Sequence, residues 1–234
     1  MRIEPDLSGT AVVLLGSFNP KIFQPFWLAS HGLIPAAAAE SADISVVHPE
    51  ITAFSIEDQF SLSVERGRLS MDRNVAPFIV IADLLGRIFG DLLPHTPITR
   101  VGINRMVHFR ARDEEHRERI GQLVAPREPW GDWGRRTSSG SGDRHGGLLS
   151  LTLVERDLND RPRGLFQVKI EPSNKIGLST RTGIYMETND HYEVVGEAPD
   201  DEKSREILAF LQERFDDSIR KSEAIIDHIM SLAT

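Results

Sequence analysis

Arginine, asparagine and histidine alternate with apolar residues along residues 98–110 (ITRVGINRMVHFR). Successive side chains of a β-strand point to opposite faces, so this pattern predicts a strand with one apolar and one polar face. The polar positions of this sheet face, together with those that neighbouring strands would add, are Arg100, Asn104, His108, Arg110, Lys169 and Glu187. Guanidinium groups and an imidazole gathered on one face can bind an anionic ligand. The alternative interpretation is a solvated face with scattered ion pairs.

A second group that could do chemistry consists of Glu187, Asp190 and His191. Two carboxylates and an imidazole could bind a metal ion or act as general acid and base. The same residues are also typical of a strand-end turn, in which Asn and Asp bond the backbone. The sequence contains no Walker loop, no G-x-S-x-G elbow and no cysteine. We therefore predict no catalytic residue, metal ligand or cofactor, and keep an enzyme at this cluster as an alternative hypothesis.

A third candidate is the segment of residues 127–147, whose second half is rich in glycine and serine. Its aromatic and basic side chains are Arg127, Trp130, Trp133, Arg135 and Arg136. Tryptophan and arginine are enriched at the hot spots of protein interfaces, so this segment is predicted to be a flexible partner-binding loop. Alternatively, both indole rings pack on the sheet and only the glycine- and serine-rich part is mobile.

The strands and helices that would position these residues occur in the same order in each half of the chain. A buried strand, a helical region and three strands precede a long apolar helix at residues 75–93, while residues 51–57 are either a further strand or an irregular continuation. The strand at residues 98–110 is again followed by a helix, three strands and a long C-terminal helix. We predict an α+β fold: a single domain (1–234) of two βαβββα halves (1–94 and 95–234) with a pseudo-two-fold internal duplication. The halves would share one antiparallel sheet with helices on one face.

At residues 102–109 (GINRMVHF) the chain resembles a sporadically distributed family of uncharacterised bacterial proteins. In that family a helix leads into a strand with a similar Gly-x-Asn-Arg core. The resemblance implies an α+β fold and a bacterial cytoplasmic setting. It implies no activity and no site residues.

Net charge and the distribution of apolar residues limit which classes of partner are expected. The formal net charge of −8 disfavours nucleic acid, although a segregated basic face could still bind it. No apolar run approaches a membrane span, and we expect a cytoplasmic protein without a membrane partner. Near the C-terminus, the apolar stripe through Ile225, Ile226, Ile229 and Met230 predicts a homodimer contact beyond the sheet edge.

Together these patterns favour a non-enzymatic binding or assembly protein with a protein partner, such as a component of a bacterial multi-protein stress or defence system. A nucleic-acid or nucleotide binder that uses the basic sheet face is the alternative hypothesis. An acid–base or metal-dependent enzyme at Glu187, Asp190 and His191 is the second alternative.

Overall fold

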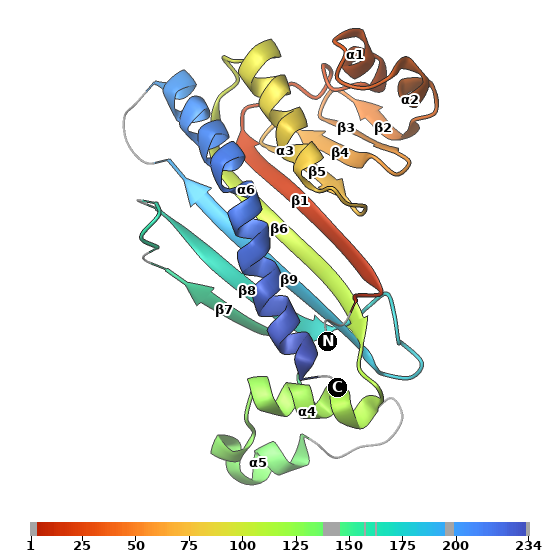
Figure 1. Ribbon diagram of the computed structural model, residues 1–234, viewed down its shortest axis with the longest axis vertical. Helices are drawn as coiled ribbons and strands as arrows, with labels where there is room; N and C mark the ends of the chain where they lie inside the picture. The colour runs from red at the N-terminus through yellow and green to blue at the C-terminus, as the bar shows by residue number, and fades with distance from the viewer. Residues whose placement is uncertain (1–3, 138–145, 157, 162, 195–198, 233–234) are drawn as a thin grey trace.

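The computed structural model describes residues 4–137, 146–156, 158–161, 163–194 and 199–232. Within them the strands form one antiparallel sheet in the order β2-β3-β4-β5-β1-β6-β9-β8-β7 (Figure 1). The strands are β1 (Leu7–Gly16), β2 (Asp43–His48), β3 (Ile51–Ile56), β4 (Phe60–Glu65), β5 (Arg68–Arg73), β6 (Ile98–Arg110), β7 (Leu151–Glu155), β8 (Gly164–Pro172) and β9 (Gly183–Glu193). The predicted α+β class with an antiparallel sheet is confirmed.

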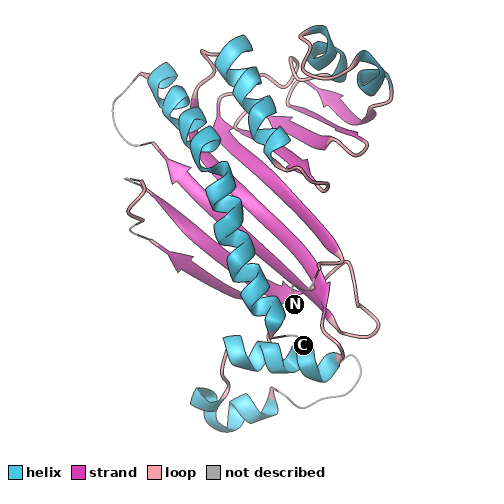
Figure 2. Cartoon of the chain, viewed as in Figure 1, coloured by secondary structure: helices cyan, strands magenta, loops and turns pink. Residues whose placement is uncertain are grey.

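Helices α3 and α6 lie against one face of this sheet, whereas α4 and α5 lie beyond one end of it (Figure 2). The helices of the described residues are α1 (Pro25–Ser30), α2 (Ala36–Glu40), α3 (Ile79–Gly86), the π-helix η1 (Arg87–Leu92), α4 (Glu114–Val124), the 3-10 helix η2 (Glu128–Trp130), α5 (Gly131–Arg136) and α6 (Asp200–Ser231). None of them is both long enough and apolar enough to span a membrane.

Strand β6 lies next to the middle strand β1, and its apolar positions face the helix layer. Val101, Ile103 and Phe109 are all almost completely buried on the face that α6 covers. Helix α6 begins with three acidic residues, which stabilise the positive end of the helix dipole. Its buried Leu211 and Phe215 belong to the larger of two core clusters. The long C-terminal helix and strand β6 therefore form the main core contact.

The strand count corrects the predicted element order. Residues 51–57, for which the sequence left two interpretations, contain the complete strand β3, so four strands and not three follow the helices of the first half. The predicted βαβββα pattern is therefore wrong for residues 1–94. Outward from the central β1–β6 pair, however, the strands follow in matching order: β5, β4 and β3 on one side, and β9, β8 and β7 on the other.

The segment of residues 127–147 is also more ordered than predicted. Helices η2 and α5 occupy Glu128–Trp130 and Gly131–Arg136, while residues 138–145 lie outside the described part of the chain. Gly134 permits this compact turn, because a Cβ at that position would lie 2.2 Å from the carbonyl oxygen of Arg127. The part that carries the tryptophans is therefore helical and not structureless, and the flexibility of the segment stays a prediction.

The apolar stripe at the end of α6 is used inside the subunit. Ile226 and Met230 are 3% and 1% exposed, and they pack in a second core cluster with Phe109 of β6 and Ile120 of α4. The predicted homodimer contact assumed that this stripe projects past the sheet. Ile225 and Ile229 of the same stripe are only partly buried, so the homodimer contact through the C-terminal helix stays a prediction.

Candidate functional site

The face of the sheet opposite α6, here called the open face, carries Arg100, Asn104 and His108 of β6. Strand β9 adds Glu187, Asn189 and His191, whose side chains alternate with the buried residues of the helix side. Lys169 of β8 lies opposite Glu187 in the register of the β8–β9 ladder. All the predicted ligand-binding positions except Arg110 line two adjoining hollows of this face. Arg110 instead forms an ion pair with Asp6, at 3.5 Å.

The two hollows make one continuous groove across the open face. Their volumes are about 660 Å³ and 520 Å³, and they share Asn74, Met106, Lys175 and Glu187. Lys175 comes from the β8–β9 connection and lines both hollows. Sites that bind small molecules are commonly concave and of this size. The groove is therefore the candidate ligand site of this protein.

A row of polar side chains crosses the sheet beneath the groove. Strand register places Ser61, Asp72, Ala11, Asn104 and Asn189 opposite one another on consecutive strands. The sequence interpretation assigned neither Asp72 nor Asn189 to this face. Period-two alternation marks their faces, but only the pairing of β1 with both β5 and β6 brings them into one row.

Gly102 makes room for the two amide groups of this row. A Cβ at residue 102 would lie 3.1 Å from Asn189 Oδ1 and 3.7 Å from Asn104 Nδ2. Asn104 Nδ2 donates weakly to the carbonyl oxygens of Ala11 and Gly102, both at 3.4 Å. By contrast, Asn189 Oδ1 and His191 Nδ1 are buried and make no hydrogen bond to any described residue. Buried polar atoms are normally paired, so these two mark a place where a ligand can bond.

His108 holds the β8–β9 connection against the open face. Ser173 Oγ accepts hydrogen bonds from the backbone N–H groups of Lys175 and Ile176, both at 3.1 Å. The Ser173 hydroxyl therefore has its own proton free to donate to His108 Nδ1, which lies 2.8 Å away. His108 Nδ1 then acts as acceptor, so the neutral ring carries its proton on Nε2. The Tyr185 ring packs against it with centroids 4.7 Å apart.

Burial shifts the ionisation of several groups in the groove. It lowers the pKa of His108, which nearby Lys175 lowers further, and it also lowers the pKa of His191. For the Asp72 carboxyl, burial raises the pKa and outweighs the opposing effects of Ser61 and Lys175. Burial and the neighbouring Glu187 charge raise the pKa of Tyr185. The histidines are therefore neutral near pH 7, and the groove does not present imidazolium groups to an anion.

These histidines make folding stability depend on pH. Their folded-state pKa lies below the ordinary 6.5, so the unfolded chain binds protons first as the pH falls. Stability is fully present above about pH 6.5 and is lost as the pH falls toward the folded-state values. Each unit of pKa depression corresponds to about 1.4 kcal/mol. Urea unfolding between pH 7.5 and 5.5 should show this loss.

The matched variants for this pH test are His108→Gln and His191→Gln. Both should flatten the pH dependence, because glutamine does not titrate. The control is His31→Gln, which changes an exposed histidine and should leave the slope as in the wild type. An unchanged slope in the His108→Gln, His191→Gln double variant would contradict the prediction.

Asp190 does not belong to the groove. It points to the helix side of β9, whereas Glu187 and His191 face the groove, so the predicted three-residue acid–base cluster is not assembled. Among the described residues, no group of three or more His, Asp or Glu is arranged to hold a metal ion. The interpretation of Glu187, Asp190 and His191 as one site is therefore wrong, because adjacent strand residues point to opposite faces.

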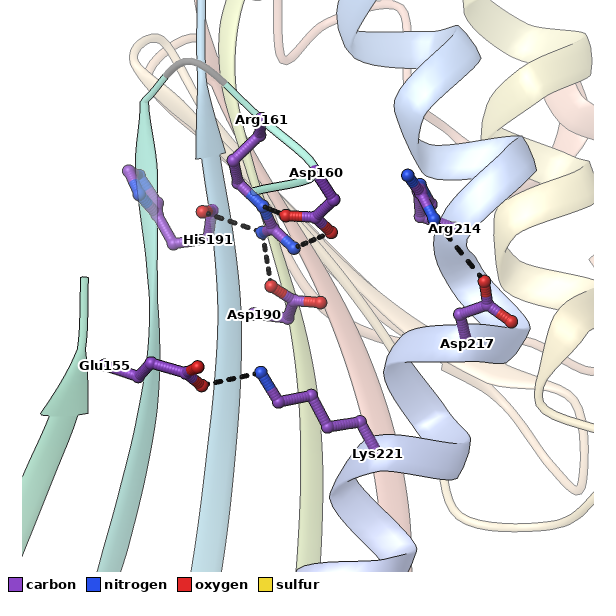
Figure 3. Close-up of polar contacts among 8 residues, drawn as sticks. All are labelled: Glu155, Asp160, Arg161, Asp190, His191, Arg214, Asp217 and Lys221. Atoms are coloured by element: carbon purple, nitrogen blue, oxygen red, sulfur yellow. Dashed lines mark hydrogen bonds and ion pairs between the residues drawn. The ribbon is translucent and has the colours of Figure 1, made fainter. Parts of the chain in front are cut away.

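Asp190 instead takes part in a buried ionic network under α6 (Figure 3). Arg161 bonds both Asp190 and Asp160, and its Nη1 also donates to the carbonyl oxygen of His191 at 3.2 Å. The Arg161 and Asp190 side chains are each only 4% exposed, and the guanidinium stacks over the Phe210 ring. This network fastens the β7–β8 connection to β9 and α6, and we assign it a structural role.

The partner-binding prediction falls on a separate surface formed by η2 and α5. Trp130 and Trp133 are 63% and 56% exposed, and their ring centroids lie 5.4 Å apart. Of the two interpretations open from the sequence, exposure of the rings is therefore the one observed. Arg127 bonds Glu118 of α4 at 2.7 Å, and Arg135 pairs with Asp132. The paired tryptophans and the neighbouring Arg135 and Arg136 are called the tryptophan surface below.

Comparison with known proteins adds no assigned site to these two surfaces. No protein-family model matches the chain, and no curated protein matches it either. The resemblance to a bacterial family therefore stays a prediction. Function has to be inferred from the geometry of the groove and of the tryptophan surface.

Proposed function

We propose that this is a non-enzymatic binding protein that docks on a protein partner through its tryptophan surface. The observation that supports this is the exposure of two adjacent indole rings on a short helical segment. Large exposed aromatic side chains are costly in water and are enriched at interface hot spots. The partner surface would offer an apolar pocket for the rings.

The charged groups around the rings indicate the chemistry of the partner's rim. Arg135 and Arg136 are exposed beside the tryptophans and lie in the last turn of α5. Complementary acidic residues on the partner would increase the association rate and fix the orientation. The apolar contact would supply most of the affinity. The salt dependence of binding is therefore expected to be weak.

Replacing both Trp130 and Trp133 by alanine should strongly reduce partner binding without unfolding the protein. A hot-spot tryptophan contributes on the order of 2 kcal/mol or more, which corresponds to about a 30-fold loss of affinity for each ring. The measurement is affinity capture from the native host with quantitative mass spectrometry, followed by titration calorimetry with the purified partner. Because both rings are largely exposed, the melting temperature should stay nearly unchanged.

The matched control is Phe26→Ala, which removes an aromatic ring that is also 63% exposed but lies on α1. This variant should retain the partner at wild-type affinity. A Trp130→Ala, Trp133→Ala protein that binds every captured partner as the wild type does would refute the proposed function.

We also infer that the two halves arose by internal duplication. This is supported by the matching order of strands on either side of the central β1–β6 pair and by the helical segment that follows the last strand of each half, α3 with η1 in the first and α6 in the second. The extra strand β2 at the edge would then be an addition to the first half.

A further inference from the structure

The groove on the open face has a floor of small side chains between polar walls. Ala11 and Val13 of β1 and Gly102 of β6 form this floor, and Val13 and Gly102 are direct partners across the ladder. Larger side chains at these positions would fill the hollow. Asn189 Oδ1 and His191 Nδ1 lie beside the floor and are buried without a hydrogen-bond partner among the described residues. The site therefore offers space and unused hydrogen-bonding capacity in the same place.

The polar side chains of the groove lie at two levels, which are defined by their position along strand β1. At one level, Arg68 and Arg100 are the strand partners that flank Leu15, and Arg100 also pairs with Glu193 at 3.3 Å. At the other, Asp72 and Asn104 flank Ala11, four residues earlier on β1. Four strand residues correspond to about 14 Å. The groove therefore carries a basic level and an acidic level, with amide groups close to the acidic one.

The Asp72 carboxyl lines the hollow and is only partly exposed. Its burial raises the pKa, although Ser61 and Lys175 act in the opposite direction. A cationic ligand group beside this carboxyl would stabilise its charged form. Arg68 and Arg100 suit a carboxylate, which a guanidinium can bind through two parallel hydrogen bonds.

We propose that the groove binds a short extended peptide of about three residues with free ends. Its carboxylate would contact Arg68 and Arg100, its ammonium would contact Asp72, and its amide groups would bond Asn189 and His191. Each extended residue spans about 3.3–3.6 Å, so three residues and the reach of the arginine side chains cover the distance between the two levels. The apolar floor would accept small ligand side chains.

The charge pattern favours such a ligand over a nucleotide or nucleic acid. Asp72 and Glu187 line the same hollow as Arg68, Arg100 and Lys175. A polyphosphate would meet both carboxylates, whereas a zwitterionic peptide has an opposite charge for each level. Both histidines of the face are also neutral at pH 7 for the reasons given above.

The test uses trialanine as the probe with the full-length protein. We expect trialanine to bind in titration calorimetry and to shift the backbone amide NMR signals of Gly102, Asn104 and Asn189. N-acetyl-trialanine and trialanine amide each lack one terminal charge and should bind at least tenfold more weakly. Asp72→Asn should weaken trialanine binding at least tenfold but leave binding of N-acetyl-trialanine unchanged. Arg68→Gln should show the same pattern with trialanine amide.

Controls separate this site from general effects and from the tryptophan surface. Arg66→Gln changes an exposed arginine that does not line the groove, and it should bind trialanine as the wild type does. Asp72→Asn should fold with an unreduced melting temperature, because it removes a partly buried charge and keeps the size of the side chain. The Trp130→Ala, Trp133→Ala variant should bind trialanine normally, so failure of the proposed partner interaction would not affect this result.

Three outcomes would overturn the proposal. The first is the absence of groove NMR shifts at trialanine concentrations up to about 10 mM, a level that would detect even weak millimolar binding. The second is equal affinity for the free and capped peptides. The third is displacement of trialanine by adenosine monophosphate that binds more tightly, which would assign the groove to nucleotides.

Discussion

Replacing Arg161 by leucine is expected to lower the free energy of unfolding by about 3–5 kcal/mol, the range for removing one partner of a buried ionic group. The change would leave Asp160 and Asp190 facing each other in the network under α6 (Figure 3) without their shared cation. Asp190 is 4% exposed, so water cannot replace the lost contacts. Urea unfolding at pH 7 measures the effect.

Two further variants identify the cause of this loss. Asp190→Asn added to Arg161→Leu should recover part of the stability, because it removes one of the uncompensated carboxylates. The matched control is Arg66→Leu, which breaks an exposed two-point contact with Glu50 and should leave the melting temperature nearly unchanged. If Arg161→Leu is as stable as Arg66→Leu, the buried network does not hold the β7–β8 connection.

Phe215→Ala is expected to cost a similar amount, about 3–5 kcal/mol, because it leaves a cavity where a large ring is removed. Phe215 is 1% exposed and lies in the larger core cluster, in which α6 packs on the central sheet. For a chain of this size each kcal/mol lowers the melting temperature by about 2–4 °C. Calorimetric unfolding should therefore show a decrease of roughly 6–20 °C.

The comparison variant for this second prediction is Phe26→Ala, which removes the same ring from an exposed position on α1. It should unfold within a few degrees of the wild type. Phe215→Leu should lose less than Phe215→Ala, because leucine fills much of the cavity. Equal melting temperatures for Phe215→Ala and Phe26→Ala would show that α6 is not held to the sheet by this ring.

Local sequence periodicity determined the parts of the fold that depend on neighbouring residues alone. Alternation along β6 separates Val101 and Ile103 from Arg100 and Asn104, and it correctly predicts which side chains share a face. The spacing of apolar residues likewise predicts α6. The prediction of one polar face with Arg100, Asn104, His108, Lys169 and Glu187 holds for the same reason.

Pairing between distant strands was decided only by the tertiary structure. Asp72 and Asn189 lie in one row because β1 pairs with β5 and β6, and β6 pairs with β9. Loop closure and the packing of the whole core select such pairings, and no local pattern records them. The groove residues that the sequence did not assign to this face are therefore those whose partners are far away in the chain.

Burial and charge pairing also required the folded chain. Asp190 looked like a partner of His191 in sequence, but its side chain meets Arg161 on the opposite face of β9. Ile226 and Met230 formed part of an apolar stripe in sequence, but the folded chain buries them in a cluster with Phe109 and Ile120. Sequence alone thus determined which residues are apolar, charged or alternating. Which of them meet, and which remain exposed like Trp130 and Trp133, was decided by long-range packing, because a side chain's environment is set by the elements that fold against it.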